Sequence, residues 1–359
     1  MKKILSIIVL TLLFIGGCSE NEQQNSGSEQ TTNGQENPEV EVVTENLDVP
    51  WSIEKHNDTF YIIERPGNIV KIEEGEVIRQ NVELEKEIAT ASEAGLLGFV
   101  LSPDFSESKS AYAYYTYENS KGQFNRIIEL RLEDDVWREE SLLLDNIPSG
   151  SWHHGGRIKI GPDGNLYATT GDGYEEDIAQ DLHSLGGKVL RMNLDGSIPS
   201  DNPFPNSYVY SYGHRNPQGI TWSSEGFIYA SEHGDNANDE INLIEPGQNY
   251  GWPIIEGHEE QEGMVPPLFT SGENETWAPS GMDYYDGRLY VAALRGSALL
   301  EFDLDEKEHR EVITGLGRLR DVLIVDGSLY FISNNTDGRG NPEDNDDKLY
   351  KIPLSSLER

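Results

Sequence analysis

Short runs of β-branched and aromatic residues recur along most of the chain, whereas apolar residues at helical spacing are scarce. One pattern repeats: an apolar pair, a turn with Asp-Gly or Glu-Gly, and then an aromatic strand. Its copies are IKIGPDGNLYATTGD near Gly164, ITWSSEGFIYASEHGD near Gly226, MDYYDGRLYVAAL near Gly287, VLIVDGSLYFIS near Gly327, and degenerate ones from Ile53 and Phe99. Because Gly accepts the positive φ of tight primed turns, each copy predicts a β-hairpin.

Regular hairpin units of this kind favour radial repetition. We therefore expect an all-β fold over residues 41–359, a six-bladed β-propeller of four-stranded antiparallel blades. The segment VEVVTENLDVPW, residues 40–51, is expected to complete the last blade and close the ring. A tandem of two-sheet sandwiches is the alternative, but it does not explain the repeated turn chemistry.

The first 18 residues, MKKILSIIVLTLLFIGGC, combine two lysines with an apolar run too short to span a membrane. The run ends in small residues and Cys18, a pattern similar to a bacterial lipoprotein signal, in which Cys18 would be lipidated. An ordinary secretory signal with a stray cysteine is the alternative. Residues 19–40 are polar and predict a disordered tether. We expect a protein anchored outside the cytoplasm by lipid alone.

The chain is strongly acidic, with 64 Asp and Glu against 27 Lys and Arg and a formal net charge of −37. A nucleic-acid partner is excluded because it would be repelled. We expect a monomer whose acidity keeps it soluble outside the cell. Clustered arginines are unusual in such a chain and therefore informative.

Five segments place polar or charged groups among Gly and small residues, where a ligand can approach the backbone. They are ASEAGLLGF with Glu93; WHHGGR with His153, His154 and Arg157; YGHRNPQG with His214, Arg215 and Asn216; ALRGSAL with Arg295; and GRLRDV with Arg318 and Arg320. Converging guanidinium groups would bind a planar ligand with several negative charges. For any single arginine, a salt bridge to a carboxylate is the better interpretation; together they predict a site.

The segment from Ser231 to Pro253 is rich in oxygen ligands suited to Ca²⁺, including Glu232, Asp235, Asp239 and Glu240. Because its spacing is not that of an EF-hand, a solvated acidic loop is an equal alternative. The polar segment from Asn334 to Asp347 is interpreted as a solvated loop in preference to a substrate entrance.

Several motifs occur in the order found in one family. They are GLLGF…PDF, WHHGGR…GPDG…GD, GGKVLRMNLDGSIPSDNPF, GHRNPQG, SEHGDNANDEINLI, NYGWP, WAPSGM and RLRDV, from about Val42 to Ile352. In this order the chain resembles the soluble quinoprotein glucose/sorbosone dehydrogenases. Because the chain is compact, it resembles their aldose sugar dehydrogenase branch more than the larger glucose dehydrogenase. The resemblance implies a six-bladed propeller that oxidises aldoses with pyrroloquinoline quinone (PQQ) and Ca²⁺.

The resemblance also implies residue roles. His153 matches the catalytic base, which would take the sugar hydroxyl proton while the C1 hydride leaves for the quinone; His154 is assigned no catalytic role. Arg215 and Asn216 match the pair that holds the quinone, and Arg215 would also stabilise charge on the quinone oxygen. Arg318 and Arg320 match paired arginines over the cofactor carboxylates, and Arg295 matches a lysine of the glucose enzymes. Glu93 matches a cofactor-contacting position that is often Gln.

Two metal positions are implied as well. The carbonyls of Gly234 and Asp235 match those that hold the calcium bound to the cofactor, although Pro is frequent at the second position. Glu240 and the carbonyl of Tyr250 match a separate structural calcium site. The expected function is oxidation of an aldose at C1 to the lactone, with electrons passed to an external acceptor. A calcium-dependent propeller hydrolase such as a lactonase, and a non-catalytic carbohydrate-binding propeller, are the alternatives.

Overall fold

The computed structural model describes residues 38–357. Apart from strands, this part of the chain contains three short helical turns, α1 (Phe105–Ser108), η1 (Glu176–Ala179) and η2 (Leu354–Ser356). None of its helices has the length and apolar character needed to cross a membrane. The prediction of an all-β chain is confirmed. The predicted signal, Cys18 and residues 19–37 of the predicted tether lie outside the described residues.

Four of the sheets contain four antiparallel strands each, in the orders β1-β24-β23-β22, β10-β11-β12-β13, β14-β15-β16-β17 and β18-β19-β20-β21. The strands of the first two sheets are β1 Glu41–Thr44, β24 Leu349–Pro353, β23 Ser328–Ser333, β22 Leu319–Val325, β10 Ile158–Ile160, β11 Leu166–Thr170, β12 Lys188–Met192 and β13 Val209–Tyr212. Those of the next two are β14 Pro217–Trp222, β15 Ile228–Glu232, β16 Glu240–Ile244, β17 Phe269–Thr270, β18 Pro279–Tyr285, β19 Arg288–Ala293, β20 Ala298–Asp303 and β21 Glu308–Thr314.

The remaining strands form one eight-stranded sheet with the order β2-β3-β4-β5-β9-β8-β7-β6. They are β2 Pro50–His56, β3 Thr59–Glu64, β4 Asn68–Glu73, β5 Glu76–Glu83, β6 Leu96–Leu101, β7 Ser110–Asn119, β8 Gly122–Glu133 and β9 Val136–Pro148. Two antiparallel halves meet where β5 and β9 pair in parallel through Val82–Trp137 and Glu83–Arg138. The predicted four-stranded unit is thus the building block, although two such units are fused at their outer edges.

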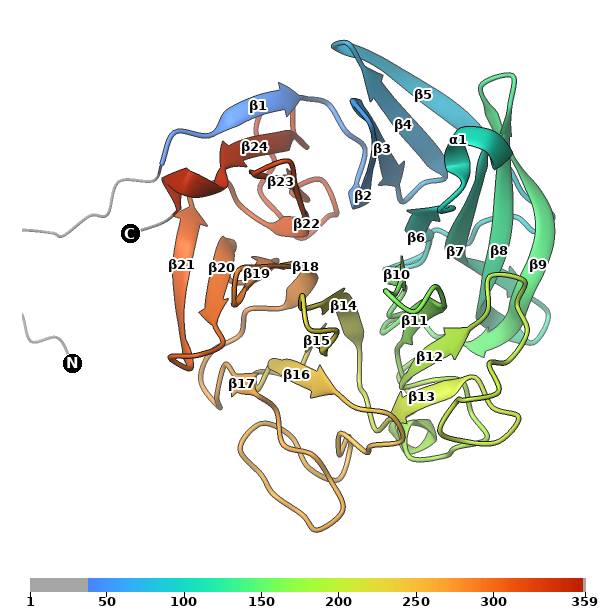
Figure 1. Cartoon of the computed structure of the whole chain (residues 1–359), viewed down its shortest axis with the longest axis vertical. Coiled ribbons are helices and arrows are strands. Elements are labelled where there is room, and N and C mark those ends of the chain that lie inside the picture. The colour runs from blue at the N-terminus through green and yellow to red at the C-terminus, as the bar shows by residue number, and fades with distance from the viewer. Residues whose placement is uncertain (1–37, 358–359) are drawn as a thin grey trace, which may run out of the picture. The chain divides into compact units, whose positions relative to one another are not determined.

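The sheets stand around a common centre, as Figure 1 shows. The innermost strands are β2, β6, β10, β14, β18 and β22, and each is followed along the chain by the next strands of its sheet. These first strands contact one another in a closed ring, β2–β6–β10–β14–β18–β22 and back to β2. The described part is therefore a β-propeller. The prediction that the segment before the first hairpin completes the last sheet is confirmed, because β1 pairs with β24.

The repeated turns fall where the sequence predicts them, between the first and second strands of a sheet. Asp286 and Gly287 join β18 to β19 with φ values of 47° and 77°, and Asp326 and Gly327 join β22 to β23 with 53° and 72°. Positive φ at both central residues is the signature of a type I′ hairpin turn, which Asp-Gly favours. Local turn chemistry therefore sets the register of these innermost hairpins.

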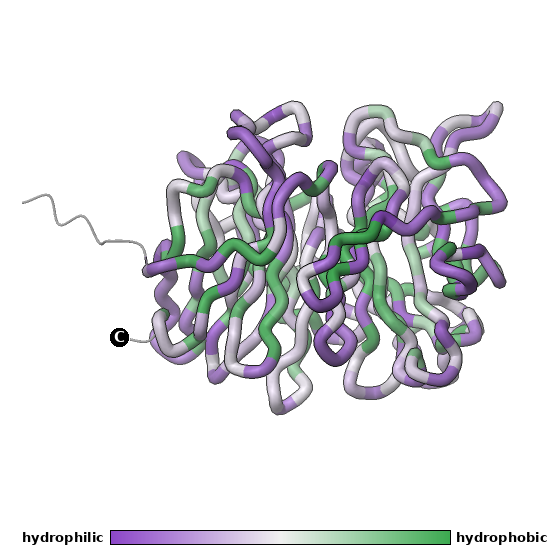
Figure 2. Tube along the Cα trace, turned by 90° about the horizontal axis from the view of Figure 1, so that it is seen from above, coloured by the Kyte–Doolittle hydropathy of each residue, from purple (hydrophilic) through white to green (hydrophobic). Residues whose placement is uncertain are grey.

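Apolar side chains fill the space between neighbouring sheets. In one such core, Leu299 of β20 lies in the same buried cluster as Leu329 and Phe331 of β23. Figure 2 shows hydrophobic positions concentrated along the strands and hydrophilic ones in the loops at both faces. Innermost strands approach closely at glycines: a Cβ on Gly219 of β14 would lie 2.3 Å from the carbonyl oxygen of Ser280 on β18. Any side chain there would force the ring apart.

Candidate active site

The predicted site residues meet because of strand polarity. In an antiparallel sheet, the start of the first strand, the end of the second and the start of the third lie at one edge. Loops that enter innermost strands carry Glu93, His153, Arg215 and Arg318, and loops between second and third strands carry Asp235 and Arg295. All of them therefore gather on one face of the propeller.

A cavity of about 300 Å³ opens among these loops. Its lining comprises Glu93, Trp152, His153, Tyr174, Arg215, Asn216, His233, Gly234, Asp235, Asn236, Asp239, Thr276, Ala278, Leu294, Arg295, Arg318 and Arg339. Eight residues predicted from the sequence are thus brought together: Glu93, His153, Arg215, Asn216, Gly234, Asp235, Arg295 and Arg318. Arg320, Glu240 and Tyr250 do not line this cavity, and Cys18 is outside the described residues.

His153 is oriented by a buried carboxylate. Its Nδ1 lies 2.6 Å from Oδ1 of Asp172, which is fully buried just beyond the end of β11. Asp172 also accepts hydrogen bonds from Nε1 of Trp252 at 2.9 Å and from the amide of Tyr174 at 2.8 Å. Because a carboxylate accepts hydrogen bonds, Nδ1 of His153 carries a proton, and the neutral ring in this tautomer presents a lone pair at Nε2. That arrangement is the one a general base requires.

The neighbouring ring faces away from the cavity. His154 is 2% exposed, and its Nδ1 lies 2.8 Å from Oγ of Ser149. Burial lowers the pKa of His154 to about 4, so the ring is neutral near pH 7. Of the two rings, only His153 lines the cavity. The backbone between them is not an extended strand, because His153 has a φ of 61°.

Glu93 forms an ion pair across the cavity mouth. Its Oε1 accepts a hydrogen bond from Nη1 of Arg339 at 2.6 Å, and its Oε2 accepts one from the amide of His153 at 3.4 Å. Burial alone would raise the pKa of Glu93, but the charge and hydrogen bond of Arg339 outweigh it and lower the pKa to about 2. The carboxylate is therefore ionised, and its charge is offset within the site.

Arg339 belongs to the polar segment that was interpreted as a solvated loop. Residues 341–345 are exposed, as that interpretation requires, but Arg339 lines the cavity and both ends of the segment are buried. The fully buried Asp347 holds the segment's two ends together, accepting hydrogen bonds from Oγ of Ser333 at 3.1 Å and the amide of Thr336 at 3.2 Å. Asp337 of the same segment pairs with Arg318 at 2.8 Å. The loop is thus built into the wall of the cavity.

Two of the predicted arginines are fixed by carboxylates. Nη2 of Arg215 lies 3.0 Å from Oδ1 of Asp235, and its guanidinium carbon lies 5.2 Å from the centre of the Trp252 ring. Its Nε is buried without a hydrogen-bond partner. Arg318 reaches Asp337 through Nε at 3.2 Å and Nη2 at 2.8 Å. These pairs hold cationic groups at the cavity wall, where an anionic ligand would meet them.

Arg320, which the resemblance matched to an arginine over the cofactor carboxylates, is buried and does not line the cavity. Its Nη1 donates to Oε1 of Gln218 at 2.8 Å, and its Nη2 donates to Oδ1 of Asn334 at 3.0 Å. Arg157 is likewise internal, paired with Asp321 at 2.9 Å. Both side chains satisfy buried polar groups of the inner strands instead of facing the cavity.

Glu240 and Tyr250 lie beside a separate small cavity that also contains Glu232. Nδ2 of Asn242 bridges the two carboxylates, at 3.1 Å from Oε2 of Glu240 and 3.5 Å from Oε2 of Glu232. Burial and the charge of Glu232 raise the pKa of Glu240 to about 8. Residues 38–357 contain no group of three His, Cys, Asp or Glu side chains that could hold a metal. A cation here would therefore need carbonyl ligands as well.

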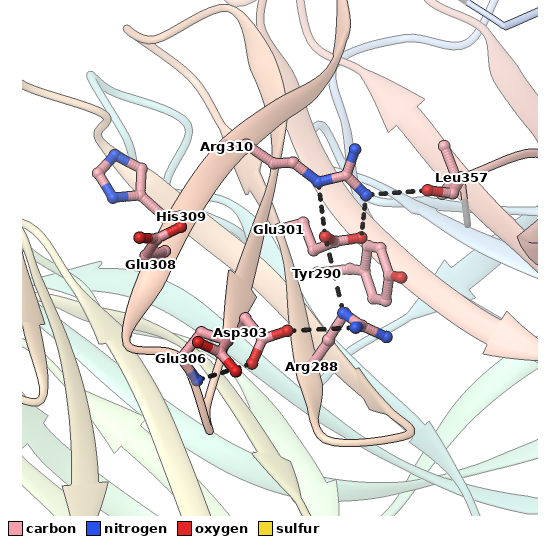
Figure 3. Close-up of a pocket in the computed structure, with 9 residues that line it drawn as sticks. All are labelled: Arg288, Tyr290, Glu301, Asp303, Glu306, Glu308, His309, Arg310 and Leu357. Atoms are coloured by element: carbon pink, nitrogen blue, oxygen red, sulfur yellow. Dashed lines mark hydrogen bonds and ion pairs between the residues drawn. The ribbon is translucent and has the colours of Figure 1, made fainter. Parts of the chain in front are cut away.

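A larger cavity, about 400 Å³, lies on the outer strands β19–β21 (Figure 3). Both of its arginines are paired with carboxylates: Arg310 donates to Glu301 at 2.7 Å, and Arg288 lies 3.2 Å from Asp303. None of the predicted site residues lines it. The cavity around His153 is therefore the candidate active site.

Sequence reasoning missed Asp172, Trp252, Tyr174 and Arg339. All of them follow the second or third strand of a sheet. Asp172 could have been found, because it ends the TTGD stretch at the edge of the sheet to which WHHGGR leads. Trp252 lies in the NYGWP motif and Arg339 in the polar segment from Asn334 to Asp347, but nothing in either segment shows that its long loop reaches the site.

Comparisons with known proteins agree with this geometry. Residues 47–349 match the family model described as glucose/sorbosone dehydrogenase. Quinoprotein glucose dehydrogenase B of Acinetobacter calcoaceticus is 35% identical over 277 residues, which cover 67% of this chain and 58% of that protein. Aldose sugar dehydrogenase of Escherichia coli (strain K12) is 29% identical over 340 residues, covering 83% and 91%.

A solved structure with the same fold is the PQQ-bound form of aldose sugar dehydrogenase from Streptomyces coelicolor. Its TM-score is 0.81 at 34% sequence identity, and the match covers 88% of this chain and 98% of that one. The likeness therefore spans the whole of that enzyme and nearly all of the part described here.

Proposed function

The chain belongs to the glucose/sorbosone dehydrogenase family, and we propose that it oxidises aldose sugars at C1 to the lactone with PQQ and Ca²⁺. An external acceptor takes the electrons. The observation that carries this proposal is the pairing of His153 with the buried Asp172 in a cavity lined by arginines. A base beside an anion-binding wall is what oxidation of a hydroxyl with a polyanionic cofactor requires.

The donor set of the cavity fits PQQ, whose carboxylates and carbonyls are hydrogen-bond acceptors. Arg215, Asn216, Arg295 and Arg318 line the cavity and would hold the cofactor, with Glu93 beside them. The buried Nε of Arg215 has no protein partner, so a donor is available for a ligand. When bound, PQQ supplies the acceptor for the two electrons released from C1.

Each residue then has one task. Oxidation at C1 removes the hydroxyl proton, and Nε2 of His153 accepts it. Asp172 keeps the imidazole in the required tautomer and stabilises the charge that His153 acquires. Arg215 stabilises negative charge that develops on the ligand oxygen nearest to it.

We assign calcium to two places. Gly234 and Asp235 line the main cavity, and their carbonyls would hold the cofactor-bound ion, which would supply a Lewis acid. Glu240 and the carbonyl of Tyr250 would hold a structural ion. Two buried carboxylates that share one amide donor favour a cation at the second place, because their mutual repulsion otherwise costs free energy.

The proposal extends to architecture and location. Counting the two halves of the eight-stranded sheet separately gives six blades, and β5 and β9 share only two residue pairs in support of this count. We infer that Cys18 carries the lipid anchor and that the enzyme acts as a monomer outside the cytoplasm. A lactonase would need side-chain carboxylates clustered on the channel axis, and residues 38–357 contain no such group of three.

Reconstitution tests this function. The purified protein is mixed with PQQ, with and without Ca²⁺, and reduction of an artificial dye is followed against a panel of aldoses. We expect bound-quinone absorbance and sugar-dependent dye reduction that needs both additions. If neither signal appears with any aldose, the proposed dehydrogenase activity is wrong.

A further inference from the structure

Arg339 is one of two exposed arginines in the cavity wall, together with Arg295. Its side chain is 44% exposed, whereas those of Arg215 and Arg318 are each 9% exposed. The two buried arginines therefore suit a cofactor enclosed in the cavity. Arg339 lies nearer to the mouth, where a small substrate enters and leaves.

The position of Arg339 is fixed from two sides. Its backbone amide donates to Oδ1 of Asp337 at 2.9 Å, and Asp337 itself is held by Arg318. Its side chain donates to Glu93, which in turn accepts the amide of His153. The guanidinium is thus tied to the backbone of the proposed base, so a ligand bound to it lies next to that base.

The guanidinium keeps donors free for a ligand. Within residues 38–357 it donates a hydrogen bond to Glu93 alone, through Nη1. Its carbon lies 4.9 Å from the centre of the Trp152 ring, and Trp152, which also lines the cavity, is 38% exposed. A planar donor fork, a carboxylate and an accessible aromatic face therefore stand together at the mouth.

This combination matches the chemistry of a sugar. The two parallel donors of a guanidinium suit neighbouring hydroxyl oxygens, and a carboxylate accepts hydroxyl protons. An aromatic face packs against the C–H groups of a pyranose ring. A carboxylate of the cofactor would be repelled by the ionised Glu93 beside the guanidinium, whereas an uncharged hydroxyl would not.

We propose that Arg339, positioned by Glu93 and packed on Trp152, binds the hydroxyl groups of the aldose and sets substrate affinity. This inference rests on the proposed aldose dehydrogenase function. Arg339 is expected to act on sugar binding and to leave the proton transfer at His153 and the binding of PQQ unchanged.

The test uses full-length protein reconstituted with PQQ and Ca²⁺. Wild type is compared with Arg339→Ala, Arg339→Lys and the control Arg131→Ala; Arg131 is similarly exposed and pairs with Glu140 at 2.8 Å far from the site. KM and kcat are measured for the best aldose. Binding of 1,5-anhydro-D-glucitol, which lacks the anomeric hydroxyl and cannot be oxidised there, is measured by calorimetry.

Arg339→Ala should raise KM and the Kd of the anhydro sugar by about tenfold, as expected for one hydrogen bond to a charged group. We expect kcat and PQQ affinity to stay within about twofold, partial recovery in Arg339→Lys, and no change in Arg131→Ala. The inference is overturned if wild type oxidises aldoses and Arg339→Ala keeps both constants, or if Arg339→Ala loses PQQ affinity instead. Absence of aldose oxidation in wild type refutes the proposed function, and this inference fails with it.

Discussion

At the scale of single residues, the chemistry depends on how His153 is held. Its left-handed backbone conformation, with a φ of 61°, is uncommon for a residue with a side chain. Asp172 and the amide of Gly173, which donates to the carbonyl of His153 at 3.3 Å, hold it in place. The sequence identified the histidine through its neighbours in the WHHGGR motif. It did not reveal the carboxylate, because that contact joins two different loops.

Asp172→Asn should slow sugar oxidation by at least about tenfold, because an amide can also donate to Nδ1 and stabilise the wrong tautomer. The affinity for PQQ should not change, since Asp172 does not line the cavity. Single-turnover reduction of bound quinone by the sugar measures the first quantity, and fluorescence titration with PQQ measures the second. An unchanged rate would show that Asp172 does not orient the base.

His154 should make the protein less stable in acid. Its pKa of about 4 in the folded state lies below the ordinary value of 6.5, so the folded state binds fewer protons than the unfolded state between these values. The stabilisation is complete above pH 6.5 and is lost as the pH falls towards 4, on the order of 3 kcal/mol in total.

His154→Gln should therefore flatten the fall in melting temperature between pH 7 and pH 4.5. His258, which is exposed, provides the control variant His258→Gln, whose profile should follow that of wild type. Equal slopes in all three proteins would contradict the assignment of His154 as a buried neutral ring.

At the scale of elements, the innermost hairpins could be predicted because their turn residues act locally. Asp286-Gly287 and Asp326-Gly327 need only their own φ values to join two strands. The strand β22 shows the limit of this reasoning. Arg318 and Arg320 read as a pair in the GRLRDV motif, yet one faces the cavity and the other bonds to Gln218, 102 positions away along the chain. Such a distant partner leaves no trace in the local pattern.

Substitution of the two arginines should separate their roles. Arg318→Lys keeps a charge for Asp337 but loses the guanidinium fork, so PQQ affinity should fall roughly tenfold with little change in melting temperature. Arg320→Lys leaves Gln218 or Asn334 without a partner in a buried place and should cost about 1–3 kcal/mol of stability. Titration with PQQ and thermal melting distinguish them. If both variants lose PQQ affinity equally at unchanged melting temperature, both arginines bind the cofactor, as the resemblance implied.

At the scale of the whole molecule, spacing and turn chemistry were sufficient to predict a propeller. They could not predict that β5 and β9 would pair and join two sheets, because Val82 and Trp137 lie in separate repeats. The site is built by loops from different sheets, which strand polarity brings to one face of the propeller. The interpretation of the segment with Arg339 as a solvated loop was incomplete, because its polar residues also form ion pairs with Arg318 and Glu93.

Cys18→Ala should release the protein from the membrane or leave the precursor unprocessed, because the anchor proposed here is attached to that thiol alone. Stable anchoring needs more than one acyl chain, as bacterial lipoproteins provide. Fractionation of cells that express wild type or the variant measures the effect. The anchor proposal is wrong if the variant remains in the membrane fraction with its signal removed.

The central claim is that His153 is the base of an aldose-oxidising site. Its most direct test is anaerobic rapid mixing of the PQQ- and Ca²⁺-loaded protein with a sugar substrate, with the absorbance of the bound quinone followed over one turnover. Removal of a general base typically slows a step by about 10²–10⁴-fold. His153→Ala should therefore slow reduction by at least about a hundredfold at unchanged PQQ affinity, and His154→Ala should stay within several-fold of wild type. The account would be contradicted if His153→Ala reduced the quinone at the wild-type rate, or if His154→Ala were slowed as much as His153→Ala.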